Sequence, residues 1–412
     1  MKAIVFTLGC KVNQCESASI AAELVSRGYE VDDKLGYADI YFINTCAVTA
    51  EAEKKSRQTV ARAKKYNPSA RIIIFGCATQ KDPTVFYEKE GVTVVSGTKE
   101  KSKIIDLLER QGIFVSTRDD KFDELYPVRE SRQRVYVKVQ DGCDNFCSYC
   151  IVPYLRGACR SRSVDSVRAE IEGLNAKEVV LTGINLSAYD REGKGLAGLI
   201  CALKGIKPRI RLGSLEVGVI TPAFLQACVE HGNVAPHFHL SLQSGSKRVL
   251  SAMNRKYTPE EYQKRVDLIR QYFPHAGITT DVIAGFPTET EAEFEESLAF
   301  IRKIGFADVH CFPYSRRTGT EAAKLPDTPP DVKKERLHRL LDVKQGLKKA
   351  FAVQNAGQTA LVLPEDQEDG YVVGYTENYL KVYLQGERDY GDDFVNVEIS
   401  DVFRDGAKAK IL

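Results

Sequence analysis

Apolar runs of strand length alternate with segments of helix length along most of this chain. Over residues 1–115, KAIVFTLG, DIYFINT and RIIIFG are predicted strands, and residues 16–27 and 50–66 are predicted helices between them. Alternation of this kind is typical of βαβ units, which build a parallel sheet. We therefore expect a parallel-sheet α/β domain over residues 1–115, followed by a polar linker over residues 116–134.

The alternation resumes at residue 135 with six further predicted strands. They are VYVKV, EVVLTG, RIRLGS, FHLSLQ, ITTDVIAG and ADVHCFPY, and predicted helices such as residues 259–272 and 291–304 separate most of them. Six strands with intervening helices predict a partial (β/α)6 barrel over residues 135–349, with a doubly wound sheet as the alternative. A long helix with an apolar stripe is expected over residues 331–353, after two prolines.

The pattern changes once more in residues 350–412, where short strands follow one another. TALVLPE, YVVGYT, YLKVYLQ, FVNVEISDVF and AKAKIL are separated by Gly, Asn and Asp turn signals. Closely spaced short strands of this kind predict a small all-β barrel of OB type. The chain is thus expected to combine three architectures.

The composition is that of an ordinary soluble globular protein, with 43% hydrophobic and 28% charged residues. No apolar run approaches the roughly 18 residues of a membrane helix, and the first nine residues lack the cleavage region of a signal peptide. We therefore expect a cytoplasmic protein that has no membrane partner. Thiols stay reduced in the cytoplasm, so the 11 cysteines suit metal or redox chemistry better than disulfides.

The net charge of +2 is unevenly distributed along the chain. Residues 1–128 carry a net charge of +1, residues 129–349 carry +8, and residues 350–412 carry −7. A basic middle region between neutral and acidic ends suits a polyanionic substrate. The alternative is that these blocks only maintain solubility, and charge alone does not decide between the two.

Cys143, Cys147 and Cys150, here called the loop triad, form a Cys-x3-Cys-x2-Cys motif directly after the first strand of the predicted barrel. Thiolates bind iron–sulfur clusters well, and this spacing lets one loop supply several ligands. Three cysteines leave one iron of a four-iron cubane open to a small chelating molecule. A zinc site is less favoured because it more often uses paired Cys-x2-Cys motifs. Three unrelated thiols in a turn are the other alternative.

Cys10, Cys46 and Cys77, here called the strand-end triad, each follow a predicted strand of the first domain. Parallel strands end at the same edge of a sheet, where ligands bind, so these thiols are expected to converge. This predicts a second three-cysteine cluster with one open iron, against the alternative that all three are small buried residues. Cys15 is interpreted as a bystander, although a position at a helix start could lower its pKa.

The cysteines lie in stretches that resemble one known family. LGCKVNQ, NTCAVT and FGCATQ, followed by DGCDNFCSYCIVPYLRG, are similar to the methylthiotransferases of the radical-SAM superfamily. The resemblance covers essentially the whole chain. It implies an N-terminal cluster domain, a radical-SAM barrel and a C-terminal TRAM domain that contains GYTENYLKVYL. Within the family, GCKVNQ resembles the branch that acts on N6-threonylcarbamoyladenosine in tRNA.

The resemblance implies two [4Fe–4S] clusters and S-adenosylmethionine (SAM) as cofactors. Each cysteine triad would hold one cluster, and SAM would occupy the open iron of the loop triad. Motifs of the family's barrel match at LTGINLSAY, HLSLQSGSKRVLSAMNR and DVIAGFPTET, whereas GSLEV departs from the usual SSIEP and keeps its glutamate. The SAM-binding residues that the resemblance implies are Tyr149, Gly183, Glu216, Gln243 and Gly285.

The implied activity is methylthiolation of C2 of the adenosine at position 37, beside the tRNA anticodon. That carbon carries an unactivated hydrogen, so a SAM-derived radical would abstract a hydrogen atom and the cluster of the strand-end triad would deliver sulfur. The implied partners are the tRNA anticodon stem-loop, an electron donor and a sulfur source. The alternatives are isopentenyladenosine 37 of tRNA, a ribosomal protein that would suit the acidic C-terminal region, and a non-catalytic iron–sulfur or RNA-binding protein.

Two groups of residues are candidates for RNA contacts. Arg156, Arg160 and Arg162 follow the cluster loop and could hold phosphates, or they form a solvated basic turn. An unpaired base could stack on one of three tyrosines of the C-terminal region, Tyr375, Tyr379 and Tyr383. The threonylcarbamoyl group carries a carboxylate, so its pocket should offer a cation, which the sequence does not identify.

Overall fold

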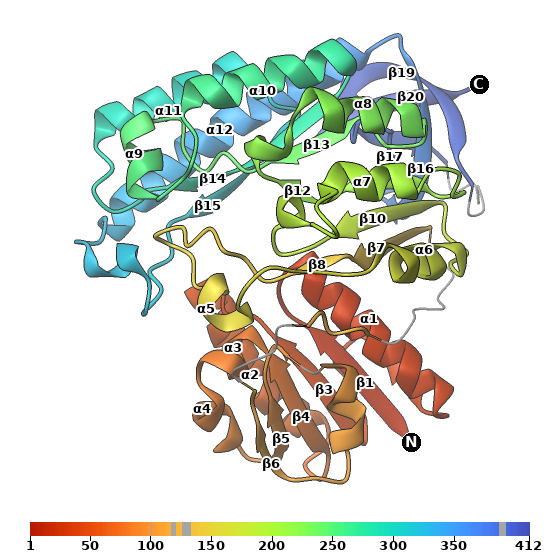
Figure 1. Ribbon diagram of the computed structural model, residues 1–412, viewed down its shortest axis with the longest axis vertical. Coiled ribbons are helices and arrows are strands. Elements are labelled where there is room, and N and C mark those ends of the chain that lie inside the picture. The colour runs from red at the N-terminus through yellow and green to blue at the C-terminus, as the bar shows by residue number, and fades with distance from the viewer. Residues whose placement is uncertain (100, 117–120, 126–132, 387–392) are drawn as a thin grey trace.

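The structure is a computed structural model that describes residues 1–99, 101–116, 121–125, 133–386 and 393–412. Its elements form an N-terminal α/β unit, a central open barrel and a C-terminal closed barrel (Figure 1). The linker expected over residues 116–134 lies mostly outside the described residues, because these omit 117–120 and 126–132.

Six parallel strands form the N-terminal sheet. Their order is β2 (Glu30–Asp32), β1 (Lys2–Thr7), β3 (Ile40–Thr45), β4 (Arg71–Gly76), β5 (Val92–Ser96) and β6 (Gly112–Phe114). Strands β3 and β4 are buried on both faces, with a separate hydrophobic core on each side of the sheet. The elements around the sheet are α1 (Lys11–Ser26), α2 (Ala50–Tyr66), α3 (Cys77–Lys81), α4 (Pro83–Tyr87) and the 3-10 helix η1 (Lys101–Leu107).

Helix α2 has the bounds that the sequence predicts, whereas helix α1 begins earlier than predicted. Helix α2 spans the predicted residues 50–66, because Thr49 caps it and accepts a hydrogen bond from the Ala52 N–H over 3.1 Å. Helix α1 begins at Lys11 rather than at residue 16. Its first turns lack a clear apolar stripe because polar residues such as Asn13 are buried there together with apolar ones.

The central barrel consists of parallel strands in two short sheets. One sheet has the order β11 (Arg209–Leu212), β10 (Glu178–Thr182) and β7 (Arg134–Lys138), and the other β12 (Ser214–Leu215), β13 (His237–Leu240), β14 (Gly277–Ala284) and β15 (Asp308–Pro313). Only Gly213 separates β11 from β12, so one segment passes from the first sheet to the second. The prediction of a partial (β/α)6 barrel is confirmed, and the doubly wound alternative is wrong.

Helices cover the outside of the central barrel. They are α6 (Val164–Glu172), α7 (Gly195–Ala202), α8 (Pro222–His231), α9 (Lys247–Ala252), α10 (Pro259–Tyr272) and α11 (Glu291–Ile304). Helices α10 and α11 have the predicted bounds because each begins with a capping box, formed by Thr258 with Glu261 and by Thr290 with Glu293. Alternate strand residues pack beneath the helices in one core, which leaves the others facing the lumen.

Helix α12 (Pro330–Asn355) joins the two barrels. Leu340 packs in the core of the central barrel and Phe351 in that of the C-terminal barrel, whereas Leu341, expected on the apolar stripe, is exposed. The domain boundary expected after residue 349 lies within this helix. The C-terminal strands close in the order β16 (Thr359–Glu368), β17 (Tyr371–Tyr375), β18 (Lys381–Gln385), β20 (Gly406–Ile411) and β19 (Val395–Phe403), which confirms the predicted all-β barrel.

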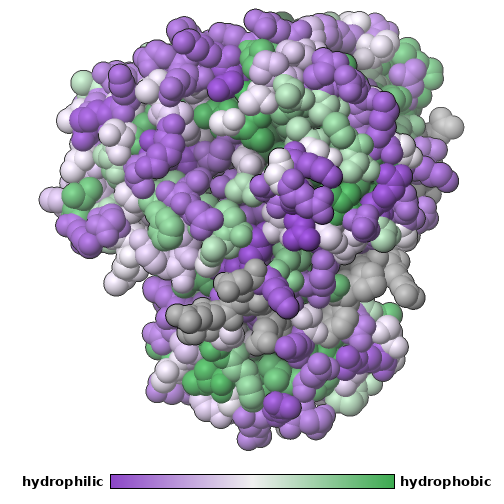
Figure 2. Space-filling model, viewed as in Figure 1, coloured by the Kyte–Doolittle hydropathy of each residue, from purple (hydrophilic) through white to green (hydrophobic). Residues whose placement is uncertain are grey.

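The surface is mostly polar on the face that Figure 2 shows, where apolar residues form small separate groups. Within the described parts of the chain, no helix combines the length and the apolar character that crossing a membrane requires.

Candidate active site

The strand-end triad lies at one edge of the N-terminal sheet. Strands β1, β3 and β4 are neighbours in register, and one cysteine follows the carboxyl end of each. Cys10 directly precedes α1, Cys46 directly follows β3, and Cys77 is the first residue of α3. The loops approach closely, because a Cβ on Gly9, the residue before Cys10, would lie 3.0 Å from Cys46 Sγ. The parallel sheet therefore gathers residues that are far apart in the sequence.

Two glycines let the cysteine loops pack directly on one another. Gly9 has a φ of +112°, and a Cβ on it would lie 2.9 Å from Cys46 Cβ. Gly76 has a φ of +111°, and a Cβ there would lie 2.6 Å from Thr45 O. Only glycine adopts such backbone conformations at this proximity without strain. Each Gly-Cys pair thus places its thiol against the neighbouring loop.

Asn13 and Thr45 hold the loops of the strand-end triad together. Asn13 Nδ2 donates hydrogen bonds to Leu8 O over 2.8 Å and to Thr45 O over 3.0 Å. Thr45 Oγ1 donates to Phe75 O over 2.8 Å and accepts from the Ala78 N–H over 3.2 Å. These bonds join the loops that follow β1, β3 and β4. The asparagine of GCKVNQ and the threonine of NTC therefore position the cysteines.

Burial raises the pKa of the Cys46 and Cys15 thiols. Cys46 is only 4% exposed, and burial raises its pKa to about 12. Binding of a metal ion would displace the thiol proton of Cys46, because cysteine binds metals as the thiolate. Burial also raises the pKa of Cys15 well above its usual value, so desolvation outweighs any effect of the helix start. Cys15 is therefore not an activated thiolate.

The loop triad lies between two short elements, the strand β8 (Gln140–Asp141) and the helix α5 (Val152–Arg156). The Cys150 N–H donates a hydrogen bond to Cys147 O over 2.9 Å. Ser148 anchors the middle of the loop, because its N–H donates to Met253 O over 3.0 Å and its Oγ to Ala252 O over 2.8 Å. The loop is thereby fixed to the end of α9, with all three thiols partly exposed.

Arg255 links the loop triad to Glu216. Arg255 Nη1 donates to Cys147 Sγ over 3.3 Å, and Nη2 donates to Glu216 Oε2 over 2.5 Å. The Arg255 guanidinium is buried, 4.9 Å from the centroid of the Tyr257 ring. Asn185 Nδ2 lies 3.8 Å from Cys143 Sγ as a second donor to sulfur. Donors of this kind stabilise thiolate charge and tune the reduction potential of a cluster.

Gly183, expected to approach SAM, provides space for Gln140. A Cβ on Gly183 would lie 2.8 Å from Gln140 Oε1. Gln140 Nε2 donates to Gly142 O over 2.7 Å, and its Oε1 accepts from the Asn185 N–H over 2.8 Å. Gly183 therefore supports the start of the cysteine loop through Gln140.

Three other residues expected to bind SAM, Tyr149, Gln243 and Gly285, interact with other parts of the protein. Arg255 acts electrostatically on Tyr149, and burial raises the pKa of the Tyr149 phenol. Gln243 has a φ of +70° and bridges to β14 through its backbone. Gly285 has a φ of +72°, and a Cβ on it would lie 2.7 Å from Lys333 Cγ. The close approach at Gly285 is therefore to α12.

A buried ion network lies between the two triads. Glu16 of α1 accepts from Lys138 Nζ and from Arg156 Nη1, both over 2.9 Å, and it also pairs with Lys101. Arg156 Nη2 donates to Asn13 Oδ1 over 2.7 Å. The three positive charges hold the pKa of Glu16 well below its usual value, despite full burial. The network joins the helix after Cys10 to the helix after the loop triad.

Arg156, Arg160 and Arg162 do not form the phosphate site or the solvated turn considered from the sequence. All three are at least nine-tenths buried. Arg160 lies near Asp141 with 3.7 Å between Nη2 and Oδ2, and Arg162 Nε donates to Glu124 Oε2 over 2.8 Å. Buried guanidinium groups require such partners, and these carboxylates come from segments that the sequence does not connect with them.

Four charged residues occupy the amino end of the central barrel. The Glu178 carboxylate accepts from Arg134 Nε over 2.6 Å, from Arg209 Nε over 2.6 Å and from Arg211 Nε over 2.8 Å. Arg211 also donates to Thr376 O of the C-terminal barrel over 3.2 Å. This arrangement connects the two barrels.

The tyrosines considered for base stacking are used within the protein. The Tyr379 ring lies between His237 and Tyr375, with 4.5 Å between centroids on each side. Tyr383 is 1% exposed and donates to Asp405. Neither face of Tyr379 is free for a base, so the expectation of stacking on Tyr379 or Tyr383 is wrong.

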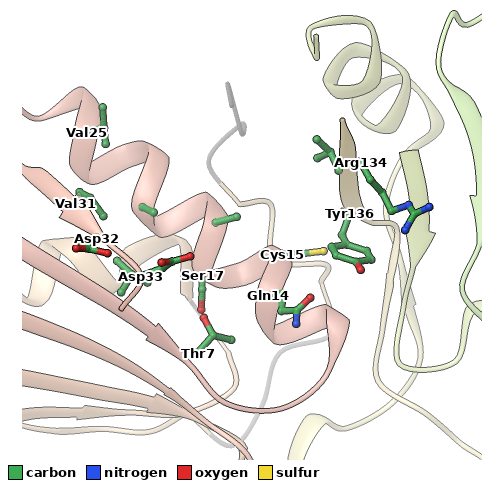
Figure 3. A pocket seen from close by; sticks show the side chains of 14 residues that line it. Thr7, Gln14, Cys15, Ser17, Val25, Val31, Asp32, Asp33, Arg134 and Tyr136 are labelled. Carbon is green, nitrogen blue, oxygen red and sulfur yellow. The ribbon is translucent and has the colours of Figure 1, made fainter. Parts of the chain in front are cut away.

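A cleft of about 580 Å³ lies between α1 and β7 (Figure 3). Thr7, Gln14 and Cys15 line it from the N-terminal unit, and Arg134 and Tyr136 from the central barrel. The Cys15 sulfur points toward the Tyr136 ring. The cleft therefore opens along the contact between the two units.

Comparisons with known proteins identify the family. A model described as the Radical SAM superfamily matches residues 137–301, and one described as uncharacterized protein family UPF0004 matches residues 2–97. Threonylcarbamoyladenosine tRNA methylthiotransferase MtaB of Bacillus subtilis (strain 168) is 38% identical over 417 residues, covering 95% of this chain and 92% of that protein. The chain belongs to the radical-SAM methylthiotransferases.

Further comparisons agree with this family. The methylthiotransferase is 34% identical to tRNA-2-methylthio-N(6)-dimethylallyladenosine synthase of Staphylococcus haemolyticus (strain JCSC1435), with 97% of this chain and 82% of that protein covered. The solved radical S-adenosylmethionine methyltransferase TsrM of Kitasatospora setae shares the fold, with a TM-score of 0.56 and 14% identity over 90% of this chain and 80% of that one. As a radical-SAM enzyme, the methylthiotransferase uses a [4Fe–4S] cluster and SAM.

Sequence reasoning missed several residues that organise the site of this methylthiotransferase. Asn185 and Arg255 lie within LTGINLSAY and HLSLQSGSKRVLSAMNR, from which the sequence analysis named Gly183 and Gln243 but not these two residues. Asn13 and Gln140 had no signal beyond their position next to a cysteine motif. Their roles depend on side-chain contacts that only the folded chain shows.

Proposed function

We propose that this methylthiotransferase converts N6-threonylcarbamoyladenosine at position 37 of tRNA to its 2-methylthio derivative. The identity of 38% over 95% of the chain with MtaB, whose name specifies threonylcarbamoyladenosine, carries the proposal. The relative named for a dimethylallyladenosine product is 34% identical, which makes isopentenyladenosine 37 the alternative. Both relatives have tRNA in their names, which favours RNA over a ribosomal protein as the substrate.

The two cysteine triads are proposed to hold two [4Fe–4S] clusters. Each triad offers three thiols, and N–H donors lie beside the sulfurs of Cys46, Cys143 and Cys147, as suits anionic thiolate ligands. When bound, the clusters and SAM supply the electron, the radical and the sulfur for the reaction. The chain's own groups set the geometry: Arg255 steadies Cys147, and the Glu16 network keeps the triads at a fixed separation.

The proposed SAM-binding residues are Tyr149, Gly183, Glu216, Gln243 and Gly285. Glu216 has the most direct support, because Arg255 holds its carboxylate beside the loop triad. Gly183 would act through the Gln140 side chain that it admits. The proposed domains span residues 1–115, 135–349 and 350–412, and α12 belongs to both barrels.

The proposed partners are the tRNA anticodon stem-loop, an electron donor and a sulfur source, with the cytoplasm as the location. The net charge of +8 over residues 129–349 supports a polyanionic partner at the central barrel.

The test is to incubate the anaerobically reconstituted enzyme with SAM, reductant and one of three substrates. These are tRNA carrying threonylcarbamoyladenosine 37, the same tRNA carrying isopentenyladenosine 37, and the candidate ribosomal protein. Mass spectrometry of nucleosides and peptides should detect the methylthio product only with the first. Product from isopentenylated tRNA alone, or from protein alone, would contradict the proposal.

A second experiment separates the roles of the triads. Replacing Cys143, Cys147 and Cys150 by Ala should remove about half of the iron and abolish reductive SAM cleavage. Replacing the strand-end triad by Ala should also remove about half of the iron, leave some SAM cleavage and eliminate the product. Product from the second variant would show that the strand-end triad does not deliver sulfur. Cys201→Ala, at an exposed cysteine outside both triads, is the control.

A further inference from the structure

A group of polar side chains faces the lumen of the central barrel. Alternate strand residues such as Val135, Phe238 and Val309 pack beneath the outer helices, so their neighbours along each strand face inward. The inward-facing residues used below are Tyr136 of β7, His239 of β13, Asp281 of β14 and His310 of β15. His239, Asp281 and His310 lie on adjacent strands of one sheet, and Tyr136 lies on the other sheet.

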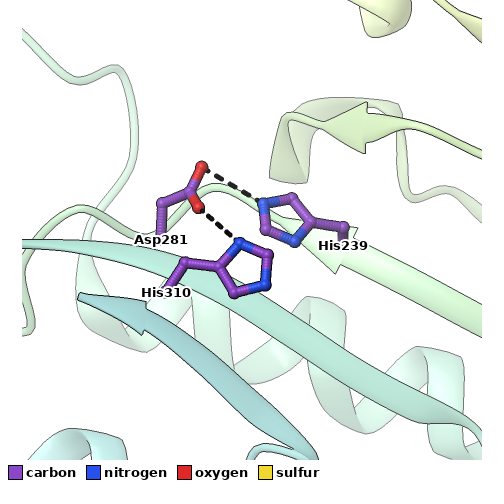
Figure 4. Close-up of side chains that lie close together, drawn as sticks. All are labelled: His239, Asp281 and His310. Carbon is purple, nitrogen blue, oxygen red and sulfur yellow. Dashed lines mark ion pairs between the residues drawn. The ribbon is translucent and has the colours of Figure 1, made fainter. Parts of the chain in front are cut away.

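His239, Asp281 and His310 form what we call the lumen cluster (Figure 4). Asp281 Oδ2 lies 3.2 Å from His239 Nε2, and Oδ1 lies 3.3 Å from His310 Nδ1. His239 Nδ1 is hydrogen-bonded to Thr279 Oγ1 over 3.0 Å, whereas its buried Nε2 has no well-aligned hydrogen bond. The His310 side chain is 47% exposed. The cluster therefore offers polar groups that a ligand in the lumen can reach.

Lys11 of α1 extends from the N-terminal unit toward the open side of the central barrel. Its Nζ lies 5.9 Å from the centroid of the Tyr136 ring, and the residue is exposed to solvent. Tyr136 lies on β7 and His310 on β15, and these strands are the outer edges of the two sheets that form the open barrel. Lys11, which directly follows Cys10, therefore lies between the strand-end triad and the lumen.

Lys11 differs from the other cations around the lumen, because it forms no ion pair among the described residues. A lysine in the first turn is also disfavoured by the helix dipole, so the stability of α1 does not explain it. The other cations have carboxylate partners: Arg134, Arg209 and Arg211 at Glu178, Lys138 at Glu16 and Asp141, and Arg255 at Glu216. Lys11 is thus available to a ligand anion.

We propose that Lys11 and the lumen cluster bind the threonylcarbamoyl group of the substrate, an inference that rests on the function proposed above. That group carries a carboxylate, a hydroxyl and urea N–H groups. The Lys11 ammonium and the His310 imidazole donate to the carboxylate, and Asp281 accepts from the hydroxyl or a urea N–H. A dimethylallyl group has no polar atom and would leave these side chains without partners, so the site selects against it.

Two histidines and a carboxylate are also a ligand set for a divalent metal ion. The structure favours the substrate instead, for two reasons. The nearby Lys11 ammonium would repel a divalent cation, whereas it attracts a carboxylate. Lys11 also adjoins Cys10 in the chain, so a group bound to Lys11 lies beside the triad proposed to deliver sulfur.

The test measures the affinity of the reconstituted holoenzyme for one tRNA with and without the threonylcarbamoyl group at adenosine 37. The wild-type enzyme should bind the modified tRNA more tightly. For Lys11→Met, the ratio of the affinity for modified tRNA to that for unmodified tRNA should be about tenfold smaller than for the wild type. The affinity for the unmodified tRNA should not change. Lys11→Arg should retain most of the preference because it keeps the charge, and His310→Gln should lose part of it. Lys34→Met, at an exposed lysine of the same unit, should match the wild type.

The outcomes distinguish this inference from the proposed function. If Lys11→Met keeps the full preference, with wild-type circular dichroism and iron content, the inference is overturned. A stoichiometric Co²⁺ absorption band in the holoenzyme that disappears in His310→Gln would also overturn it, because the cluster would then be a metal site. A wild-type enzyme that methylthiolates only isopentenylated tRNA would refute the proposed function instead.

Discussion

Arg156 Nη1 donates a hydrogen bond to Glu16 Oε1 over 2.9 Å, between two side chains that are almost completely buried. Glu16 lies on the helix that follows Cys10, and Arg156 lies on the helix that follows Cys150. This ion pair therefore connects the two cysteine triads across the contact between the N-terminal unit and the central barrel. Separating two buried charges costs free energy, because each would remain away from water without its partner. The pair therefore favours one separation of the two triads.

Glu16→Gln should destabilise the protein by about 3–5 kcal/mol, because it leaves Lys101, Lys138 and Arg156 buried without their shared carboxylate. Thermal unfolding followed by circular dichroism at pH 7 measures the effect. Glu23→Gln, which removes a surface ion pair with Arg27 on the same helix, should cost less than about 1 kcal/mol. Equal effects of the two substitutions would contradict the role of the network.

Arg255→Met should lower the reduction potential of the cluster proposed at the loop triad by on the order of 60 mV, a tenfold change for a one-electron couple. The substitution removes a positive charge and an N–H donor 3.3 Å from Cys147 Sγ, both of which favour the reduced and more negative cluster. A redox titration followed by electron paramagnetic resonance measures the shift. Arg168→Met, at a surface arginine of α6, is the control and should leave the potential unchanged.

Glu178 should contribute to stability above about pH 4.5 and lose that contribution as the pH falls toward 2. Its three arginines lower its pKa from 4.5 to about 2, against the effect of burial. A carboxyl group with a lowered pKa stabilises the folded state while it is ionised, here by about 3 kcal/mol, and stops doing so once it is protonated.

The difference in stability between the wild type and Glu178→Gln should therefore narrow steadily from pH 5 to pH 3. Urea unfolding at several pH values measures it, and the comparison at each pH cancels other acid effects. Glu172→Gln, at an exposed carboxylate of α6, should show no such trend. A difference that does not depend on pH would exclude Glu178 as the titrating group.

The affinity for tRNA should fall steeply with salt if the basic central region contacts phosphates. Each phosphate neutralised adds up to roughly one to the slope of log K against log salt. Fluorescence anisotropy with labelled tRNA from 50 to 200 mM salt gives the slope. An affinity that does not change with salt would show that the net charge of +8 over residues 129–349 is not the RNA footprint.

The architecture and the cysteine triads were predictable because they depend on local patterns. Strand-length apolar runs and helix-length segments alternate in the order that parallel α/β units require, and each of three predicted strands leads into a Gly-Cys or Thr-Cys pair. The bounds of α10 and α11 were also predictable, since their capping boxes lie within four consecutive residues. Cys143, Cys147 and Cys150 share one loop, which their spacing alone indicates.

Tertiary structure decided which charges are buried and what each side chain contacts. Arg156 resembles a surface arginine in the sequence, but its partner Glu16 lies 140 residues away. Tyr379 resembles a base-stacking residue until His237 covers one of its faces. Lys11 resembles any lysine of a motif in the sequence, and only the fold places its Nζ 5.9 Å from the centroid of the Tyr136 ring. The sequence by itself determined most of the elements and the positions of the two cysteine triads, because these follow from neighbouring residues, whereas pairing between distant side chains depends on how the elements pack.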